Sequence, residues 1–245
     1  MNNMKTFNYA GKLKVSIWGF IIILVTAVSV SQLFGQWQPK KSLEGAFYWK
    51  NGKAMFFKGN RYIRYDINTD RTDAGYPKTI DNNNWPGLPW KNGIDTAVNW
   101  DNGKIYFFKG NQYIRYDINA DRADGGYPKA IDNNNWPGLP WKHGIDAAVN
   151  WGNGKAYFFK GNQYVRYDIN ADRVDAGYPK AINNETWPGL PWREIDAAVN
   201  WGNGKAYFFK GSQYIRYDIN ADRVDPGYPK IINNETWPGL PALFR

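Results

Sequence analysis

One unit of about fifty residues occurs four times in this chain, and this repeat limits the possible folds more than any other feature. The copies begin at Glu44, Asp95, Asp146 and Asp196, at intervals of 51, 51 and 50 residues. Together they fill residues 44–241 of a 245-residue chain. A period of this length indicates a supersecondary unit that stacks on copies of itself.

Each unit shows the pattern of short β-strands separated by tight turns. In the second unit, strands are predicted at residues 96–100, 104–108 and 113–118, with "DNGK" and "KGNQ" turns between them. Gly and Pro crowd residues 119–128, where a short outer strand is expected. The segment that follows, "PKAIDNNNWPGLP" at 128–140, is predicted to begin as a helical turn with proline at its start.

Both faces of these predicted sheets carry large apolar side chains. Alternation along 113–118 places Tyr113, Arg115 and Asp117 on one face and Ile114, Tyr116 and Ile118 on the other. Aromatic residues make up 18% of the chain, which is ample for a large core. A sheet with two apolar faces needs a neighbour on each side, and a closed ring of sheets provides both.

The repeated motifs resemble the hemopexin repeat. They are the opening "DAA", the hairpin "GKAYFFKG", the strand "YxRYD" and the closing "GYPKxI…WPGLP". The resemblance implies an all-β, four-bladed hemopexin-like propeller at 44–245, similar to plant hemopexin-type albumins and bacterial photopexins. Its expected blades are 44–90, 94–141, 145–192 and 195–241.

Closure of this ring has to rely on packing. Animal members of the family join the first blade to the last with a disulfide, whereas this chain has no cysteine. The expected seam residues are Trp37, or Leu243 and Phe244.

The N-terminal segment is predicted to be an apolar helix that serves as a signal peptide or a membrane anchor. Residues 1–16 contain three Lys and no acid, and an apolar run at 17–30 follows them. The uncharged stretch is near the lower limit for a membrane span, so cleavage and anchoring both remain open. We assign residues 1–36 to this segment and 37–43 to a linker. Either alternative predicts an extracytoplasmic protein, secreted or held at the membrane through residues 17–36.

The resemblance also implies a cation in the central channel. In this family the opening strands line the channel, and their backbone carbonyls surround an ion. Such hard oxygen ligands favour calcium or sodium. The alternative is that the acids only pin the strand starts and the channel holds water. The implied carbonyl ligands and the channel-lining alanines two residues further on are Glu44, Asp95, Asp146 and Asp196, with Ala46, Ala97, Ala148 and Ala198.

Two other motifs are candidate ligand sites. His143 is the single histidine, and it is a weak candidate for heme, which one domain would hold only weakly or as a homodimer. An exposed linker histidine is the alternative. The repeated "DINAD", as at 117–121, begins like a calcium-binding loop but lacks the required Gly and Glu, so a self-capped turn is expected.

The charge pattern argues against a nucleic-acid partner. Of the net charge of +9, residues 1–43 carry +5, and elsewhere acids and bases alternate. Arg115 lies two residues before Asp117, and this pairing recurs in every blade. It predicts ion pairs between blades, with a polyanion-binding surface as the alternative.

No catalytic constellation stands out, because the acid-rich motifs recur once per blade and a reaction centre needs an asymmetric site. The leading prediction is therefore a non-catalytic, exported binding module, with a channel cation and an unidentified protein or small-molecule ligand. The alternatives are a heme-binding or scavenging protein and a storage or structural protein.

Overall fold

Four antiparallel sheets, the blades, build the part of the chain that the computed structural model describes, residue 41 and residues 43–245. The chain divides into two units, Met1–Lys40 and Lys41–Arg245. The predicted N-terminal helix, with its signal or anchor at 1–36, lies outside the described residues. Within the described residues, no helix is both long and apolar enough to cross a bilayer.

Each blade has three long strands and two short outer ones. Blade 1 contains β1 (Gly45–Tyr48), β2 (Lys53–Lys58), β3 (Arg61–Asp66), β4 (Arg71–Thr72) and β5 (Lys78–Thr79). Blade 2 contains β6 (Thr96–Asn99), β7 (Lys104–Lys109), β8 (Gln112–Asp117), β9 (Arg122–Ala123) and β10 (Lys129–Ala130). Blade 3 contains β11 (Ala147–Asn150), β12 (Lys155–Lys160), β13 (Gln163–Asp168), β14 (Arg173–Val174) and β15 (Lys180–Ala181). Blade 4 contains β16 (Ala197–Asn200), β17 (Lys205–Lys210), β18 (Gln213–Asp218), β19 (Arg223–Val224) and β20 (Lys230–Ile231).

The prediction of a helical turn after Pro128 is wrong. Residues Lys129–Ala130 form β10 instead, pairing with Tyr113 and Gln112 of β8. The next residue continues the contact, because the Ile131 N–H donates to the Asn111 carbonyl at 2.8 Å. The far edge of β8 leaves main-chain groups that need partners, and a two-residue strand satisfies them.

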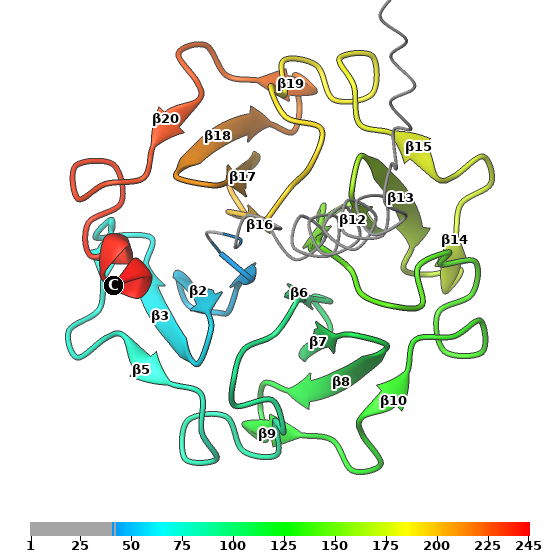
Figure 1. Ribbon diagram of the computed structural model, residues 1–245. Coiled ribbons are helices and arrows are strands. Elements are labelled where there is room, and N and C mark those ends of the chain that lie inside the picture. Colours follow the sequence, from blue (N-terminus) through cyan, green and yellow to red (C-terminus); the bar gives the residue numbers. More distant parts are fainter. Residues whose placement is uncertain (1–40, 42) are drawn as a thin grey trace, which may run out of the picture. The chain divides into compact units, whose positions relative to one another are not determined.

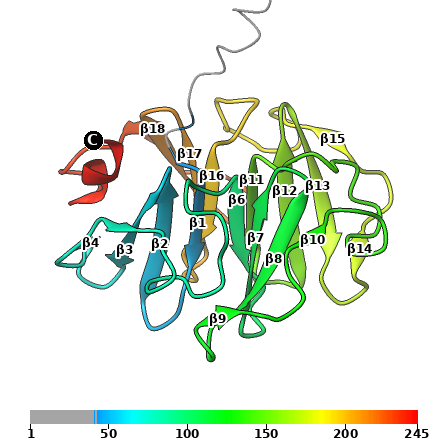
Figure 2. The same ribbon diagram turned by 60° about the horizontal axis from the view of Figure 1, so that its bottom comes forward.

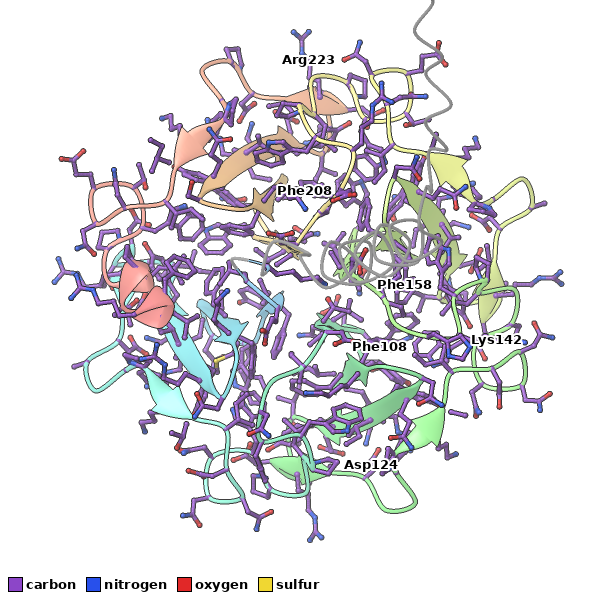
Figure 3. All side chains as sticks on the ribbon, in the orientation of Figure 1. Phe108, Asp124, Lys142, Phe158, Phe208 and Arg223 are labelled. Carbon is purple, nitrogen blue, oxygen red and sulfur yellow. The ribbon has the colours of Figure 1, made fainter. Side chains whose placement is uncertain are left out.

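The apolar core consists of four clusters, one between each pair of neighbouring blades. The two faces of β8 serve different clusters: Ile114 and Tyr116 pack toward blade 1, and Tyr113 packs toward blade 3. The predicted two-sided sheet is thereby confirmed. In Figure 3, Phe108, Phe158 and Phe208 lie inside the ring, whereas Asp124, Lys142 and Arg223 lie toward its outer edge.

The "WPG" motif joins each blade to the next in two ways. Its tryptophan is buried between the blades, as Trp136 shows with its ring 5.2 Å from Phe108 and 5.5 Å from Phe158. Its proline carbonyl accepts a hydrogen bond from the following blade, as Pro86 does from Ala123 N at 2.9 Å. One motif therefore supplies both the apolar filler and the polar link at every interface.

The ring closes between blades 4 and 1 without a covalent link. The Pro238 carbonyl accepts from Thr72 N at 2.9 Å, as at the other interfaces. The terminal 3-10 helix η1 (Leu240–Phe244) lies beside β3 of blade 1, and its Leu243 is 1% exposed (Figure 1). The prediction for Leu243 is thus confirmed, Phe244 remains 37% exposed, and Trp37 lies outside the described residues.

The linker is shorter at its C-terminal end than expected. Leu43, assigned to the linker at 37–43, is fully buried in the cluster between blades 4 and 1. An apolar side chain that fills the seam belongs to the propeller core, so the propeller begins before Glu44.

The first strand of each blade lines the centre of the ring. β1 contacts β6 and β16, and β11 contacts the same two strands, so the four form a closed channel wall (Figures 1 and 2). The strands enter at Glu44, Asp95, Asp146 and Asp196, which define the acid end of the channel. They finish at Tyr48, Asn99, Asn150 and Asn200, which define the asparagine end.

Candidate binding sites at the two ends of the channel

At the acid end, the four carboxylates pin the strand starts. Each accepts a hydrogen bond from the glycine N–H in the second turn of its own blade. The pairs are Glu44–Gly59 at 2.7 Å, Asp95–Gly110 at 2.7 Å, Asp146–Gly161 at 2.8 Å and Asp196–Gly211 at 2.9 Å. Among the described residues no cluster of three or more acidic, His or Cys side chains could hold a metal ion. Any metal here would therefore depend on main-chain carbonyls, as the resemblance implied.

A lysine side chain reaches these carbonyls. Lys41 Nζ lies 2.7 Å from the carbonyl oxygen of Asp146 and 3.4 Å from that of Asp95. It also lies 3.7 Å from the Asp146 carboxylate. The Lys41 carbonyl in turn accepts a hydrogen bond from Lys58 of blade 1. A single residue before the first blade thus connects blades 1, 2 and 3 at the acid end.

Two of the carboxylates at this end also pair with lysines of the hairpins. Lys160 Nζ lies 3.0 Å from the Asp146 carboxylate, and Lys210 Nζ lies 3.1 Å from that of Asp196. Burial opposes ionisation of Asp146, but the Gly161 N–H, Lys41 and Lys160 outweigh it and lower its pKa. Burial lowers the pKa of Lys41, although the nearby carboxylates of Asp146, Asp95 and Asp196 oppose this effect.

At the asparagine end, side-chain amides link neighbouring blades. Asn99 Nδ2 donates to the Tyr48 carbonyl at 2.8 Å. Asn150 donates to the Asn99 carbonyl at 3.2 Å, and Asn200 to the Asn150 carbonyl at 3.1 Å. Blade 1 has Tyr48 where the other blades have asparagine. The series of amide hydrogen bonds from blade to blade therefore stops at the seam between blades 4 and 1. The channel mouth is consequently asymmetric.

Two hollows open at this asymmetric end. The central one, of about 380 Å³, has apolar walls that include Val98, Ala148 and Val199. The second, of about 320 Å³, lies between blades 1 and 2 and includes Trp49, Lys50 and Ile118. Both share Tyr48, Asn99 and Asp101. Sequence reasoning missed this site, although the replacement of asparagine by Tyr48 in one copy of four was a visible signal.

The alanines expected in the channel are all buried. They are Ala46, Ala97, Ala148 and Ala198, between 0% and 2% exposed. All but Ala97 line the central hollow, and each of the four also packs in an interblade cluster.

The other sequence candidates have simpler surroundings. His143 is exposed on the link between blades 2 and 3, and the sequence offers no second histidine to join it. In "DINAD", Asp117 Oδ1 accepts from Asn119 N and Ala120 N, both at 2.8 Å, which is the expected self-capped turn.

The repeated charges form ion pairs within a blade, so their predicted position between blades is wrong. Arg115 pairs with Asp124 and not with Asp117, which pairs with Lys104 at 2.7 Å. Lys104 also lies 3.1 Å from Asp124. Antiparallel pairing sets Lys104 directly opposite Asp117, which explains the choice of partner. The hydrogen bond from Lys104 lowers the pKa of Asp117 to about 2.

Four blades around a lined channel define a four-bladed β-propeller. The hemopexin family model matches residues 43–89, 94–140, 145–191 and 195–242, and the chain belongs to this family. Human matrix metalloproteinase-21 is 34% identical over 194 residues, which cover 68% of this chain and 33% of that protein. The chain thus spans about a third of the length of this relative.

Solved structures agree on the fold. The hemopexin fold protein CP4 from cow pea superposes with a TM-score of 0.70 at 24% identity, covering 82% of this chain and 98% of that one. A plant lectin with two metal binding sites from Cicer arietinum gives a TM-score of 0.63 at 24% identity, covering 82% and 97%.

Proposed function

We propose that this protein is a non-catalytic, exported binding module that takes a small organic ligand at the asparagine end of its channel. The observation that carries this proposal is the pair of hollows that share Tyr48, Asn99 and Asp101. The central hollow falls in the lower part of the size range of ligand pockets, which is about 300–1,000 Å³. Tyr48 makes this end of the channel asymmetric, which distinguishes the site from features that occur once in every blade.

The lining indicates the ligand's chemistry. Val98, Ala148 and Val199 offer an apolar floor, and Asp101 stands at the rim. Trp49 and Lys50 extend the second hollow as an aromatic and cationic wall. A small amphipathic molecule fits this combination when its apolar body lies in the central hollow and its one polar or cationic group faces Asp101.

The test uses indole and tryptamine as probes, because they share an apolar ring and differ in a cationic arm. We expect saturable binding by calorimetry, with tryptamine tighter than indole. Tyr48→Asn, which gives blade 1 the residue of the other three blades, removes a wall of both hollows and should weaken binding about tenfold. Lys142→Ala, at the outer edge of the ring (Figure 3), is the control and should bind like the native protein. Equal binding by native protein and Tyr48→Asn would reject this site.

We also propose that the carbonyl oxygens at the acid end hold a cation, calcium or sodium. The carbonyls of Asp95 and Asp146 already converge on a cationic group, the Lys41 ammonium, which supports an oxygen cage suited to positive charge. Main-chain oxygens of the first strands would be the ligands, while the carboxylates stay with their glycine N–H partners. Chelation followed by a thermal melt tests for calcium, and a melt in a buffer without sodium tests for sodium. A melting curve unchanged by both treatments would remove the ion.

A further inference from the structure

The lysine at the acid end is placed as an ion would be. Its Nζ lies 2.7 Å from the Asp146 carbonyl and 3.4 Å from the Asp95 carbonyl, oxygens that two different blades contribute. It comes from the segment before blade 1, so it reaches across the channel mouth rather than along its own strand. The hairpin lysine Lys160, by contrast, approaches the side chain of Asp146, at 3.0 Å.

Lysine side chains balance part of the negative charge at the acid end of the channel. Lys160 and Lys210 already pair with carboxylates of blades 3 and 4. Lys41 adds a positive charge whose side chain is only 27% exposed. Removing an ammonium from water is costly unless oxygens replace its hydration shell, and the two carbonyls together with the Asp146 carboxylate provide that replacement.

A metal ion bound between the carbonyls of Asp95 and Asp146 would take the position of the ammonium. Calcium binds oxygen at about 2.3–2.6 Å, so an ion at this position would overlap the lysine nitrogen. Binding of a metal ion therefore requires Lys41 to leave. The hydrogen bonds from Lys41 to the two carbonyls are lost before the carbonyls can coordinate the metal.

We propose that Lys41 is a built-in cation that occupies the acid end of the channel and competes with calcium for its carbonyl oxygens. The inference rests on the proposed cation site and adds its regulation. If the ammonium holds the carbonyls for about nine-tenths of the time, calcium affinity falls about tenfold.

The first experiment compares calcium binding by calorimetry, in a buffer without sodium, to the native chain, Lys41→Met and Lys160→Met. Both variants remove one positive charge near the Asp146 carboxylate, but only Lys41→Met vacates the carbonyls. We expect Lys41→Met to bind calcium about tenfold or more tightly than the native protein, and Lys160→Met to gain less than about threefold. Equal gains in the two variants would overturn the competition, because general electrostatics would then explain both.

The outcomes also separate this inference from the cation site itself. Tight binding by the native protein, unchanged in Lys41→Met, would keep the cation site and reject the role of Lys41. Absence of calcium binding in all three proteins would reject both.

A second measurement needs no variant. Acetylation of Lys41 in the native protein, followed by mass spectrometry, should be slow without calcium and faster with saturating calcium, whereas Lys142 should react equally in both. A Lys41 rate that calcium does not change would overturn the proposal.

Discussion

The closure of the ring depends on the apolar side chains of η1, and Leu243→Ala tests this dependence. Leu243 is 1% exposed in the cluster between blades 4 and 1. Truncation of a buried leucine costs about 2–5 kcal/mol, from lost transfer free energy and the cavity left behind. Since η1 lies at the chain terminus and can relax, we expect the lower part of that range, about 2–3 kcal/mol.

Phe244→Ala is the matched control, because it changes the neighbouring residue of the same helix. Phe244 is 37% exposed, so its truncation should cost less than about 1 kcal/mol. For a domain of this size, about 1 kcal/mol shifts the melting temperature by about 2–4 °C. Leu243→Ala should therefore melt roughly 4–12 °C lower and Phe244→Ala less than about 4 °C lower.

The assay is urea unfolding followed by tryptophan fluorescence, with calorimetry for the melting temperature. Amide exchange adds local information, because Thr72 N donates to the Pro238 carbonyl across the seam. Exchange at Thr72 should accelerate more than at Ala123, which makes the same bond between blades 1 and 2. Equal costs for the two variants, or a cost below about 1 kcal/mol for Leu243→Ala, would refute packing by η1 as the means of closure.

The ion pairs predict a loss of folding stability at low pH, and the buried tyrosines predict a loss at high pH. Lys104 lowers the pKa of Asp117 to about 2, so its stabilisation is present above the unfolded pKa of about 3.9 and is lost as pH falls toward 2. Melting temperatures measured across this interval should fall, and Asp117→Asn should reduce the slope; an unchanged slope would contradict this. Burial raises the pKa of Tyr214 to about 12, so its contribution is complete below about pH 10 and is lost as pH rises through about 12. Tyrosinate absorbance should show the buried tyrosines, Tyr214 among them, ionising later in the native chain than in urea, and identical titrations would refute it.

The local pattern of the sequence was enough to predict the blades. Alternation along 113–118 predicted two apolar faces, and the structure uses both, with Tyr116 and Tyr113 in different interblade clusters. The Gly-containing turns and the period of the repeat gave the strand positions within a few residues. The strand positions and the alternation of faces depend on residues near in sequence, so the pattern of one unit is enough to predict them.

Ion-pair and strand partners that depend on the register between strands were harder to predict. Arg115 and Asp117 share a strand face, yet each pairs with a residue of another segment, Asp124 and Lys104. Likewise, β10 follows Pro128 because the edge of β8 needs partners, and the residues 128–140 alone resemble a helix start. Register between strands decides both outcomes.

The four copies of one unit determined, from sequence alone, sheets with two apolar faces that need a neighbour on each side, whereas the lined centre with carboxylates at its entrance was implied by the resemblance to the hemopexin repeat. Only the tertiary structure decided that Lys41 crosses the mouth to the carbonyls of blades 2 and 3. It also decided that Tyr48 interrupts the series of amide hydrogen bonds beside two hollows. The reason is physical: the axis is where four distant segments converge, and the direction of a side chain there depends on contacts that no single repeat contains.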